Sequence, residues 1–371
     1  MMSRSGSESV PLESVEVRAF RVPTDTPSES DGTFTWSSTT MVLVQAAGGG
    51  HRGIGYTYAD ASAAALVRDT LANVIRGMNV LDVAHIWSAL VTAVRNIGRG
   101  GIASMAIAAI DAALWDLKAK LFGLPLVSLL GGVRDAIPVY GSGGFTSYSE
   151  TELCRQLSCW VAQGIPRVKM KIGREASADA ARVAAARRAI GDSAELFVDA
   201  NGAYGVKQAI AQAQRFAESG VSWFEEPVNY RDLDGLRFVR QHTPPGMEIS
   251  IGEYGFVPDT FASILKHGAV DVLQADASRC EGITGFGTVD GLCDATMTPL
   301  STHCAPSLHV HAACAAKRVR HLEYFHDHVR IEHLFFDGAL SPVDGALRPD
   351  LGRPGLGLTL KEADARKFER T

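Results

Sequence analysis

The chain has 371 residues, of which 46% are hydrophobic and 21% charged, and its formal net charge is −5. These values are typical of globular proteins, and the length suits a barrel with additional elements. The sequence contains no block of basic residues, which argues against nucleic-acid binding. The six cysteines form no C-x-x-C pair, so reduced thiols in the cytoplasm are expected.

The start of the chain gives no sign of export. Residues 1–11 are rich in Ser and Glu and lack the apolar segment of a signal peptide. No apolar run in the sequence approaches the ~18 residues that span a membrane. We therefore expect a soluble, cytoplasmic protein with no membrane partner.

The first third of the chain, residues 1–136, predicts a small α+β domain. A polar stretch at 23–32 is expected to be a loop, and Gly123-Leu-Pro125 is a plausible helix stop. By hydrophobic periodicity, strands are predicted at residues 14–20, 39–44 and 53–58, and helices at 62–78, 80–94 and 102–121. The three strands should form an antiparallel meander.

After residue 137 the pattern changes to short apolar runs whose starts lie 22 to 29 residues apart. The runs are 138–141, 167–172, 195–199, 222–225, 248–252, 270–276, 297–303 and 320–325, and most are joined by Ala-rich helical segments. Eight strands alternating with helices predict an α/β fold of the (β/α)8 barrel type. A doubly wound open sheet is the alternative, but no strand leads into a G-x-G-x-x-G turn.

Ionisable side chains stand at the ends of the predicted barrel strands, where such a barrel has its active site. From the second strand to the eighth these polar residues are Lys169 and Lys171, Asp199 and Asn201, Glu225 and Glu226, Glu253, Asp276, His303 and Glu323. A merely structural barrel would not be expected to carry a charge at every strand end.

The two lysines and three of the carboxylates indicate a metal centre. Lys169 and Lys171 share one face of an otherwise apolar strand, because side chains alternate along a strand, and buried ammonium groups need anions nearby. The carboxylates of Asp199, Glu225 and Glu253, which end adjacent strands, would repel one another without a cation. Oxygen ligands suit a hard ion, so Mg²⁺ is the expected cofactor.

The strand-end motifs follow one another in a distinctive order. They are Lys169-Met-Lys171, Val198-Asp199-Ala-Asn201, Glu225-Glu-Pro227, Gly252-Glu253, Asp276, Ser301-Thr-His303 and His321-Leu-Glu323, accompanied by residues 109–116 and 353–357. In this order and spacing they resemble the enolase superfamily, specifically its mandelate racemase subgroup. The resemblance implies a modified TIM barrel, (β/α)7β, over residues 137–335. A capping domain would be built from residues 1–136 and the C-terminal tail, residues 336–371.

The resemblance also implies metal-assisted removal of the proton next to a carboxylate group. Asp199, Glu225 and Glu253 would hold Mg²⁺, which binds the substrate carboxylate and stabilises the enediolate. Lys171 would be one general base, with its pKa lowered by Lys169 and the metal. Lys169 would mainly neutralise the substrate carboxylate.

Further roles follow from the same resemblance. His303, oriented by Asp276, would be the acid/base on the opposite face of the substrate. Glu323 would hydrogen-bond the substrate carboxylate as it gains charge, best when protonated. Glu226 is not carried over as a ligand, because the family uses the first acid of the Glu-Glu-Pro motif. Asn201 either caps its turn or takes part in binding at the metal site.

Substrate specificity is expected to come from two cap loops, residues 31–36 and 55–60. Both are rich in Thr, Tyr and Asp, and Trp36, Tyr56 and Tyr58 are the candidate substrate contacts. A hydroxyl-rich lining suits a polyhydroxylated acid. Arg279 is either a loop charge or a substrate contact.

The predicted reaction is dehydration of a sugar acid to a 2-keto-3-deoxy acid. Racemisation or epimerisation of a 2-hydroxy acid is the alternative, because it needs the same Lys171 and His303. Asp276 stands where cycloisomerases of the superfamily have a lysine, which favours the racemase-like group. Family analogy also predicts a homo-oligomer whose other partner is a small carboxylate substrate.

Two classes of protein other than a racemase-like enzyme are also considered. One is a non-catalytic sugar-acid binder, which an intact set of bases and ligands disfavours. The other is a zinc-dependent barrel hydrolase, which would want a His-x-His on the first barrel strand, and residues 138–144 have none. Such a hydrolase would draw on the histidines of the second half, His303, His321, His326, His328 and His333.

Overall fold

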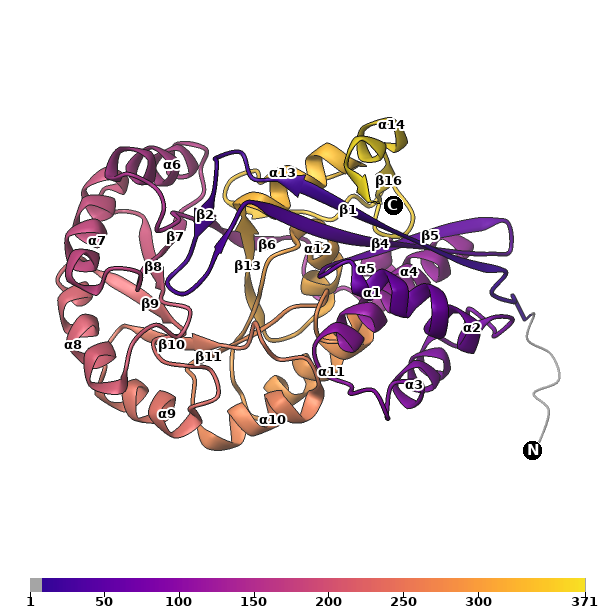
Figure 1. Ribbon diagram of the computed structural model, residues 1–371, viewed down its shortest axis with the longest axis horizontal. Helices are drawn as coiled ribbons and strands as arrows, with labels where there is room; N and C mark the ends of the chain where they lie inside the picture. Colours follow the sequence, from indigo (N-terminus) through magenta and orange to yellow (C-terminus); the bar gives the residue numbers. More distant parts are fainter. Residues whose placement is uncertain (1–8, 371) are drawn as a thin grey trace.

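The computed structural model describes residues 9–370 (Figure 1). The Ser- and Glu-rich start of the chain, residues 1–8, on which most of the signal-peptide prediction rests, lies outside the described residues. Within residues 9–370, every helix is too short or too polar to cross a bilayer.

An antiparallel sheet forms the base of the cap, as predicted. Its strands are β1 (Ser14–Pro23), β4 (Ser38–Gly48) and β5 (His51–Tyr58), and the late strand β17 (Glu369–Arg370) pairs with the outer edge of β1. Arg18 on β1 forms ion pairs with Glu362 and Glu369, both at 2.8 Å. The sheet is therefore assembled from both ends of the described chain.

Helix α4 (Ile102–Leu121) covers this sheet and matches its predicted bounds. The predicted helix at 62–78 is interrupted, because a π-helical turn, Val67–Leu71, separates α1 (Ser62–Leu66) from α2 (Ala72–Ile75). The other cap helices are α3 (Val83–Ala93) and α5 (Leu126–Leu130). Gly53 and Gly55 of β5 let α4 approach closely, since a Cβ at either position would lie 2.1–2.2 Å from a carbonyl oxygen of α4.

All eight predicted barrel strands are present and parallel, and β13 pairs with β6, which closes the barrel and excludes the open sheet. The strands are β6 (Ile137–Gly143), β7 (Arg167–Lys171), β8 (Glu195–Asp199), β9 (Val221–Glu225), β10 (Glu248–Ile251), β11 (Val272–Ala275), β12 (Leu300–Thr302) and β13 (Val319–Phe325). The helices are α6 (Glu150–Ala162), α7 (Ala176–Ile190), α8 (Val206–Ala217), α9 (Leu233–His242), α10 (Pro258–His267), α11 (Gly282–Ala295), α12 (Pro306–Ala315) and α13 (His326–Phe335). The ribbon shows α6 to α10 curving around the strands (Figure 1).

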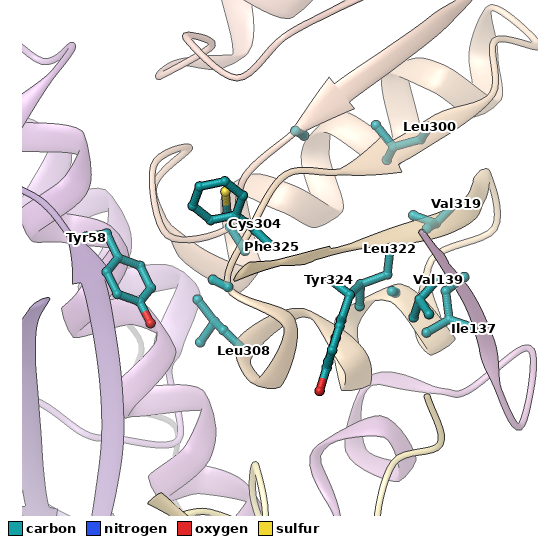
Figure 2. Close-up of a cluster of buried hydrophobic side chains, with 14 of the residues drawn as sticks. Tyr58, Ile137, Val139, Leu300, Cys304, Leu308, Val319, Leu322, Tyr324 and Phe325 are labelled. Atoms are coloured by element: carbon teal, nitrogen blue, oxygen red, sulfur yellow. The ribbon is translucent and has the colours of Figure 1, made fainter. Parts of the chain in front are cut away.

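The barrel has an apolar outside and a layered inside. At the closing seam, Ile137 and Val139 of β6 lie beside Val319 and Leu322 of β13, all buried (Figure 2). Inside, a separate cluster of Tyr140, Phe197, Trp223 and Val272 is completely or almost completely buried. Because these large side chains fill the lower barrel, water is excluded beneath the charged strand ends.

The C-terminal segment touches both the cap and the barrel. It contains β14 (Phe336–Asp337), β15 (Ala346–Leu347), β16 (Thr359–Leu360) and α14 (Glu362–Ala365), and β15 pairs with the barrel strand β6. The buried carboxylate of Asp116 on α4 accepts hydrogen bonds from the backbone N–H groups of Ile54 (2.7 Å) and Leu356 (2.6 Å) and from Lys120 Nζ (2.7 Å). Asp116 therefore joins helix, sheet and tail.

Replacing Asp116 by Ala should destabilise the cap strongly. Two buried N–H groups and the Lys120 ammonium lose their acceptor, which should lower the free energy of unfolding by about 3–5 kcal/mol. Urea titration followed by circular dichroism measures the change. Asp69→Ala is the control, because Asp69 forms an exposed pair with Arg68 and its removal should matter little. Equal stability of the two variants would contradict the role of Asp116.

Candidate active site

A cavity of about 540 Å³ lies at the C-terminal ends of the barrel strands, between barrel and cap. From the barrel it is lined by Lys171, Asn201, Glu253, Tyr254, Arg279, His303, Cys304, Glu323, Phe325, Asp327 and His328. From the cap it is lined by Asp31, Phe34, Trp36, Ser38, Thr39, Thr40, Tyr58, Ala59 and Asp60. Most of the residues singled out from the sequence thus meet in one place.

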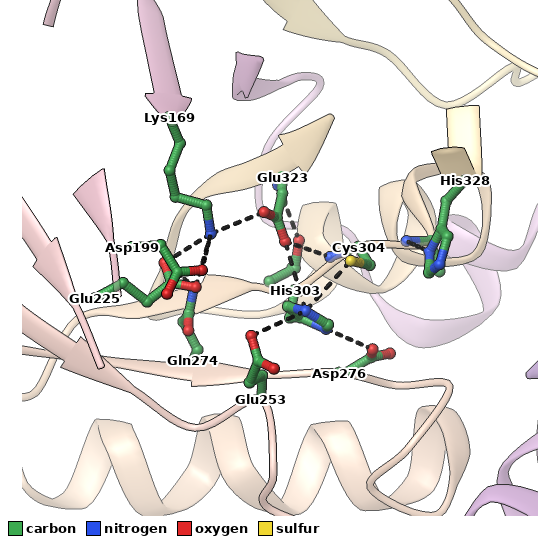
Figure 3. A network of polar contacts seen from close by, with 12 residues as sticks. Lys169, Asp199, Glu225, Glu253, Gln274, Asp276, His303, Cys304, Glu323 and His328 are labelled. Atoms are coloured by element: carbon green, nitrogen blue, oxygen red, sulfur yellow. Dashed lines mark hydrogen bonds and ion pairs between the residues drawn. The ribbon is translucent and has the colours of Figure 1, made fainter. Parts of the chain in front are cut away.

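The two lysines of β7 face the same group of acids, as the strand alternation predicts. Lys169 Nζ lies 2.7 Å from both carboxylate oxygens of Glu225 and 2.8 Å from Glu323 Oε1 (Figure 3). Lys171 pairs with Asp199. Lys169 is fully buried and stands behind the cavity lining, whereas Lys171 lines the cavity.

The protein's own groups raise the pKa of Lys171, so its predicted lowering rests on the metal rather than on Lys169 alone. Burial lowers the pKa of the Lys171 amine, and so does Lys169, but the carboxylates of Asp199, Glu253 and Glu225 together outweigh both and raise it. The prediction named Lys169 and the metal as the groups that lower this pKa, and it did not include the ion pair of Lys171 with Asp199 on β8. A neutral Lys171 therefore requires that Asp199 be engaged by another cation.

Asp199, Glu225 and Glu253 come together as expected. Each offers an oxygen, these oxygens all lie within 4.8 Å of one another, and the three residues are buried. Burial raises the pKa of Glu225 to about 8, although the charge of Lys169 opposes the shift. A compact, buried, oxygen-only donor set fits Mg²⁺, which needs carboxylate ligands and leaves coordination positions for water or substrate oxygens.

His303 stands between two carboxylates. Its Nδ1 lies 2.8 Å from Asp276 Oδ2, and its Nε2 lies 3.3 Å from Glu253 Oε2 (Figure 3). Burial alone lowers the pKa of an imidazole, but Glu253 and Asp276 hold the pKa of His303 well above its ordinary value. Asp276 is itself fixed by the backbone N–H of Ser278 at 2.7 Å. The imidazolium is thus the favoured form, with Nε2 turned toward the carboxylate cluster.

Glu323 is predicted to hydrogen-bond the substrate carboxylate best when protonated, but its neighbours in this structure favour the ionised form. It pairs with Lys169 and accepts a hydrogen bond from the backbone N–H of Cys304 at 2.8 Å. Burial raises the pKa of a carboxyl, but the charges of Lys169, His303 and Lys171 together outweigh burial and lower the pKa of Glu323. Glu323 is therefore ionised in this arrangement.

The cap contributes two of its three predicted aromatic contacts. Trp36 and Tyr58 line the cavity, and the Tyr58 ring stacks on His328 with 3.4 Å between ring centroids. Tyr56 was expected to contact substrate, and this is wrong. Tyr56 is fully buried and donates a hydrogen bond to Glu332 at 2.7 Å, because it lies on the same face of β5 as Tyr58 but two residues farther from the strand end that reaches the cavity.

Asn201 and Arg279, left open by the sequence, both reach the cavity. The Asn201 backbone N–H donates to Asp199 at 2.9 Å, and its buried side-chain oxygen has no partner among the described residues. Arg279 donates to the backbone oxygen of Glu253 at 3.0 Å and lies 3.6 Å from Asp276. Arg279 thus links the carboxylate cluster to the His303–Asp276 pair.

Several lining residues were missed by sequence reasoning. Cys304 has its sulfur 3.3 Å from His303 Nε2, and Tyr254 and Asp327 also line the wall. His328, named from the sequence only for the alternative zinc hydrolase, lies beside them. They directly follow Glu253, His303 and β13, so widening each strand-end motif by a few residues would have found them. Among residues 9–370, each group of potential metal ligands contains at most one histidine, which argues against the zinc hydrolase.

A cap hairpin, residues 29–36, forms part of the cavity roof. It consists of β2 (Glu29–Ser30) and β3 (Thr35–Trp36), and it is held to the barrel by the backbone N–H of Thr146 donating to Ser30 (2.8 Å). Gly32 allows the closest approach, because a Cβ there would lie 2.5 Å from the backbone oxygen of Ala200 and 2.6 Å from that of Ile172. The ends of β7 and β8 therefore sit directly against the hairpin turn.

Family models match most of the chain. A model described as mandelate racemase/muconate lactonizing enzyme, N-terminal domain, covers residues 14–131, and one described as enolase C-terminal domain-like covers residues 152–364. Within the described structure, these ranges correspond to most of the cap and to the barrel with part of the tail.

Three similar proteins illustrate the range of the match. A mandelate racemase/muconate lactonizing enzyme-like protein from Rubrobacter xylanophilus is 52% identical, with a TM-score of 0.95 over 97% of this chain and 100% of that one. The 3,6-anhydro-alpha-L-galactonate cycloisomerase of Streptomyces coelicolor is 34% identical over 84% of this chain and 86% of its own. L-talarate/galactarate dehydratase from Salmonella typhimurium, solved with Mg and L-lyxarohydroxamate, is 27% identical, with a TM-score of 0.89 over 98% and 94%.

Gly32→Ala should push the cap hairpin away from the barrel. The backbone oxygens of Ala200 and Ile172 belong to rigid strand ends, so the hairpin must yield, and such overpacking typically costs about 1–3 kcal/mol. Hydrogen exchange at amides 30–36 should accelerate relative to the unmodified protein.

Gly100→Ala is the matched control, because a Cβ at Gly100 meets no atom within 4 Å. Unchanged hydrogen exchange in the hairpin of the Gly32→Ala variant would show that the contact of Gly32 with Ala200 and Ile172 does not hold the hairpin against the barrel.

Proposed function

We propose that this protein dehydrates a sugar acid to a 2-keto-3-deoxy acid, because the chain belongs to the mandelate racemase/muconate lactonizing enzyme family of the enolase superfamily. Enzymes of this family use Mg²⁺. The observation that carries the proposal is one cavity lined by a lysine, a carboxylate-oriented histidine and Glu253, the member of an acid cluster fitting Mg²⁺ that reaches the cavity. Abstraction of an acidic C–H and expulsion of a hydroxyl need a base, an acid and positive charge beside the substrate carboxylate.

Asp199, Glu225 and Glu253 would hold the metal ion. Mg²⁺, when bound there, supplies positive charge that lowers the pKa of the α-C–H of the substrate. The lysines are tied to the same acids, Lys169 to Glu225 and Lys171 to Asp199. A cation held by these carboxylates would weaken both pairs and would favour the neutral amine that Lys171 needs as a base.

The proton then moves between groups of this chain. The Lys171 amine accepts the α-proton, and the electron pair of the broken C–H bond expels the β-hydroxyl. His303, as imidazolium, gives its Nε2 proton to that hydroxyl, which leaves as water, and the resulting enol becomes the 2-keto acid. Asp276 is a positioning residue, because its bond to Nδ1 directs Nε2 into the cavity. Lys169 and Arg279 add positive charge around the substrate carboxylate.

Sugar acids are favoured as the substrate class by two observations. The cavity lining is rich in polar side chains from both barrel and cap, including Asp31, Thr39, Asn201 and Arg279, which suits several hydroxyl groups. The similar dehydratase from Salmonella typhimurium was solved with L-lyxarohydroxamate, and the similar Streptomyces coelicolor protein is a cycloisomerase of an anhydro-galactonate. Trp36 and Tyr58 would form the apolar wall against the carbon chain.

A library of aldonic, aldaric and anhydro acids tests the reaction. Each acid is incubated with the protein and Mg²⁺ in D₂O, and 2-keto-3-deoxy products and deuterium at the α-carbon are measured. At least one acid should give keto product. Deuterium exchange without keto product would favour racemisation, and a cyclised or ring-opened product would favour cycloisomerisation. Absence of all three signals with every acid would refute the proposal.

Lys171→Ala and His303→Asn should each lower turnover by at least about 10²-fold, since each removes a proton-transfer group. Calorimetric Mg²⁺ titration should show that the metal still binds, because both residues lie outside the ligand set. Lys207→Ala, at an exposed lysine early in α8, is the control and should leave turnover unchanged. Near-normal turnover in either active-site variant would reject that assignment.

A further inference from the structure

A second cluster of potential metal ligands lies outside the candidate active site, where the segment after β1 crosses the start of α13. It consists of Asp25, Glu29 and His326, whose ligand atoms all lie within 4.8 Å of one another. His326 Nε2 is 2.8 Å from Asp25 Oδ2. From the sequence, residues 23–32 were predicted to be a loop, and Asp25 and Glu29 had no predicted role.

Glu29 is the member of this cluster that its surroundings leave unexplained. Its side chain is 0% exposed, and neither carboxylate oxygen has a hydrogen-bond partner among the described residues. A buried carboxylate without a donor is strongly disfavoured, so either a cation or a proton must balance it.

The nearby donors do not balance Glu29, because they are directed at Asp327. Asp327 accepts hydrogen bonds from Trp36 Nε1 at 3.2 Å and Thr39 Oγ1 at 3.0 Å, and Arg330 lies 3.4 Å away. His326 is directed at Asp25. The site therefore has one carboxylate more than its donors satisfy.

We propose that Asp25, Glu29 and His326 bind a divalent transition-metal ion, with Zn²⁺ preferred over Mg²⁺. One imidazole nitrogen with two carboxylates is a donor set that zinc accepts readily, whereas Mg²⁺ prefers oxygen alone. A cavity of about 350 Å³, lined by Asp25 and His326 together with Glu152 and Arg155, gives the ion a path from solvent and room for a water ligand.

The ion would connect the cap to the barrel at the roof of the active site. Glu29 lies in β2 opposite Trp36 of β3, and Trp36 lines the active-site cavity. His326 directly follows β13, whose Glu323 also lines that cavity. Binding at this cluster therefore fixes the cap hairpin, residues 29–36, over the barrel mouth at the start of β2, in addition to the Gly32 contact at its turn.

Zinc counting tests the site without any assay of turnover, so the result does not depend on the proposed reaction. The full chain is dialysed against Zn²⁺ in excess Mg²⁺, which occupies the oxygen-only site, and bound zinc is measured by elemental analysis. Glu29→Gln and His326→Gln should each bind one zinc ion fewer per chain than the unmodified protein. Glu29→Gln keeps the shape of a protonated carboxyl, and His326 is partly exposed, so at least one variant should fold.

Cys304→Ala is the necessary control, because His303, Cys304 and Glu323 form the other group in which a zinc ligand set could arise. This variant should retain the zinc ion assigned to Glu29. If only Cys304→Ala loses zinc, or if Glu29→Gln and His326→Gln bind as much zinc as the unmodified protein, the proposal is overturned and Glu29 carries a proton instead.

Hydrogen exchange tests the link to the roof. Zinc should slow exchange at amides 29–36 of the unmodified protein several-fold and leave the Glu29→Gln variant unchanged. Equal slowing in both proteins, or none in either, would refute the coupling between this cluster and the cap hairpin.

Discussion

The structure depends on charge balance among buried groups at the mouth of the barrel. Asp199, Glu225 and Glu323 are each paired with a lysine of β7, and Glu253 lies against His303. Each of these charges would be prohibitively costly in isolation below the cap. The lysines thus make the acid cluster tolerable before any metal or substrate arrives, and the same contacts keep the acids directed at one point.

The parallel barrel produces this balance through register. Lys171 is paired in register with Asp199, and Asp199 with Glu225, so three charged side chains from distant parts of the sequence become neighbours. The large aromatic side chains of Tyr140 and Trp223 lie below them, and Trp223 Nε1 donates to Glu225 at 3.0 Å. The barrel interior therefore excludes water beneath the acids and fixes their orientation.

The barrel and most of its site could be predicted from the sequence. The eight strands follow from the spacing of the apolar runs, and the site follows from the charged residues at the strand ends. The protonation of Lys171 and Glu323 could not, because it depends on contacts across strands rather than on sequence neighbours. Tyr56 was misplaced because the sequence does not show that only the end of β5, at Tyr58, reaches the cavity. The burial of Glu29 could not be predicted, because a contact between cap and barrel produces no hydrophobic periodicity in the sequence.

The pairing of β17 with β1 has a consequence for how the molecule forms. Ala19 pairs with Arg370, and Arg18 contacts Glu369 across 351 residues of sequence, so the cap sheet closes over one of the longest possible loops. During synthesis the outer edge of β1 stays unpaired until the ribosome has passed residue 370. Contacts of such high sequence separation form slowly, and an open strand edge invites intermolecular pairing. Nascent chains of this protein should therefore be most prone to aggregate just before the tail docks.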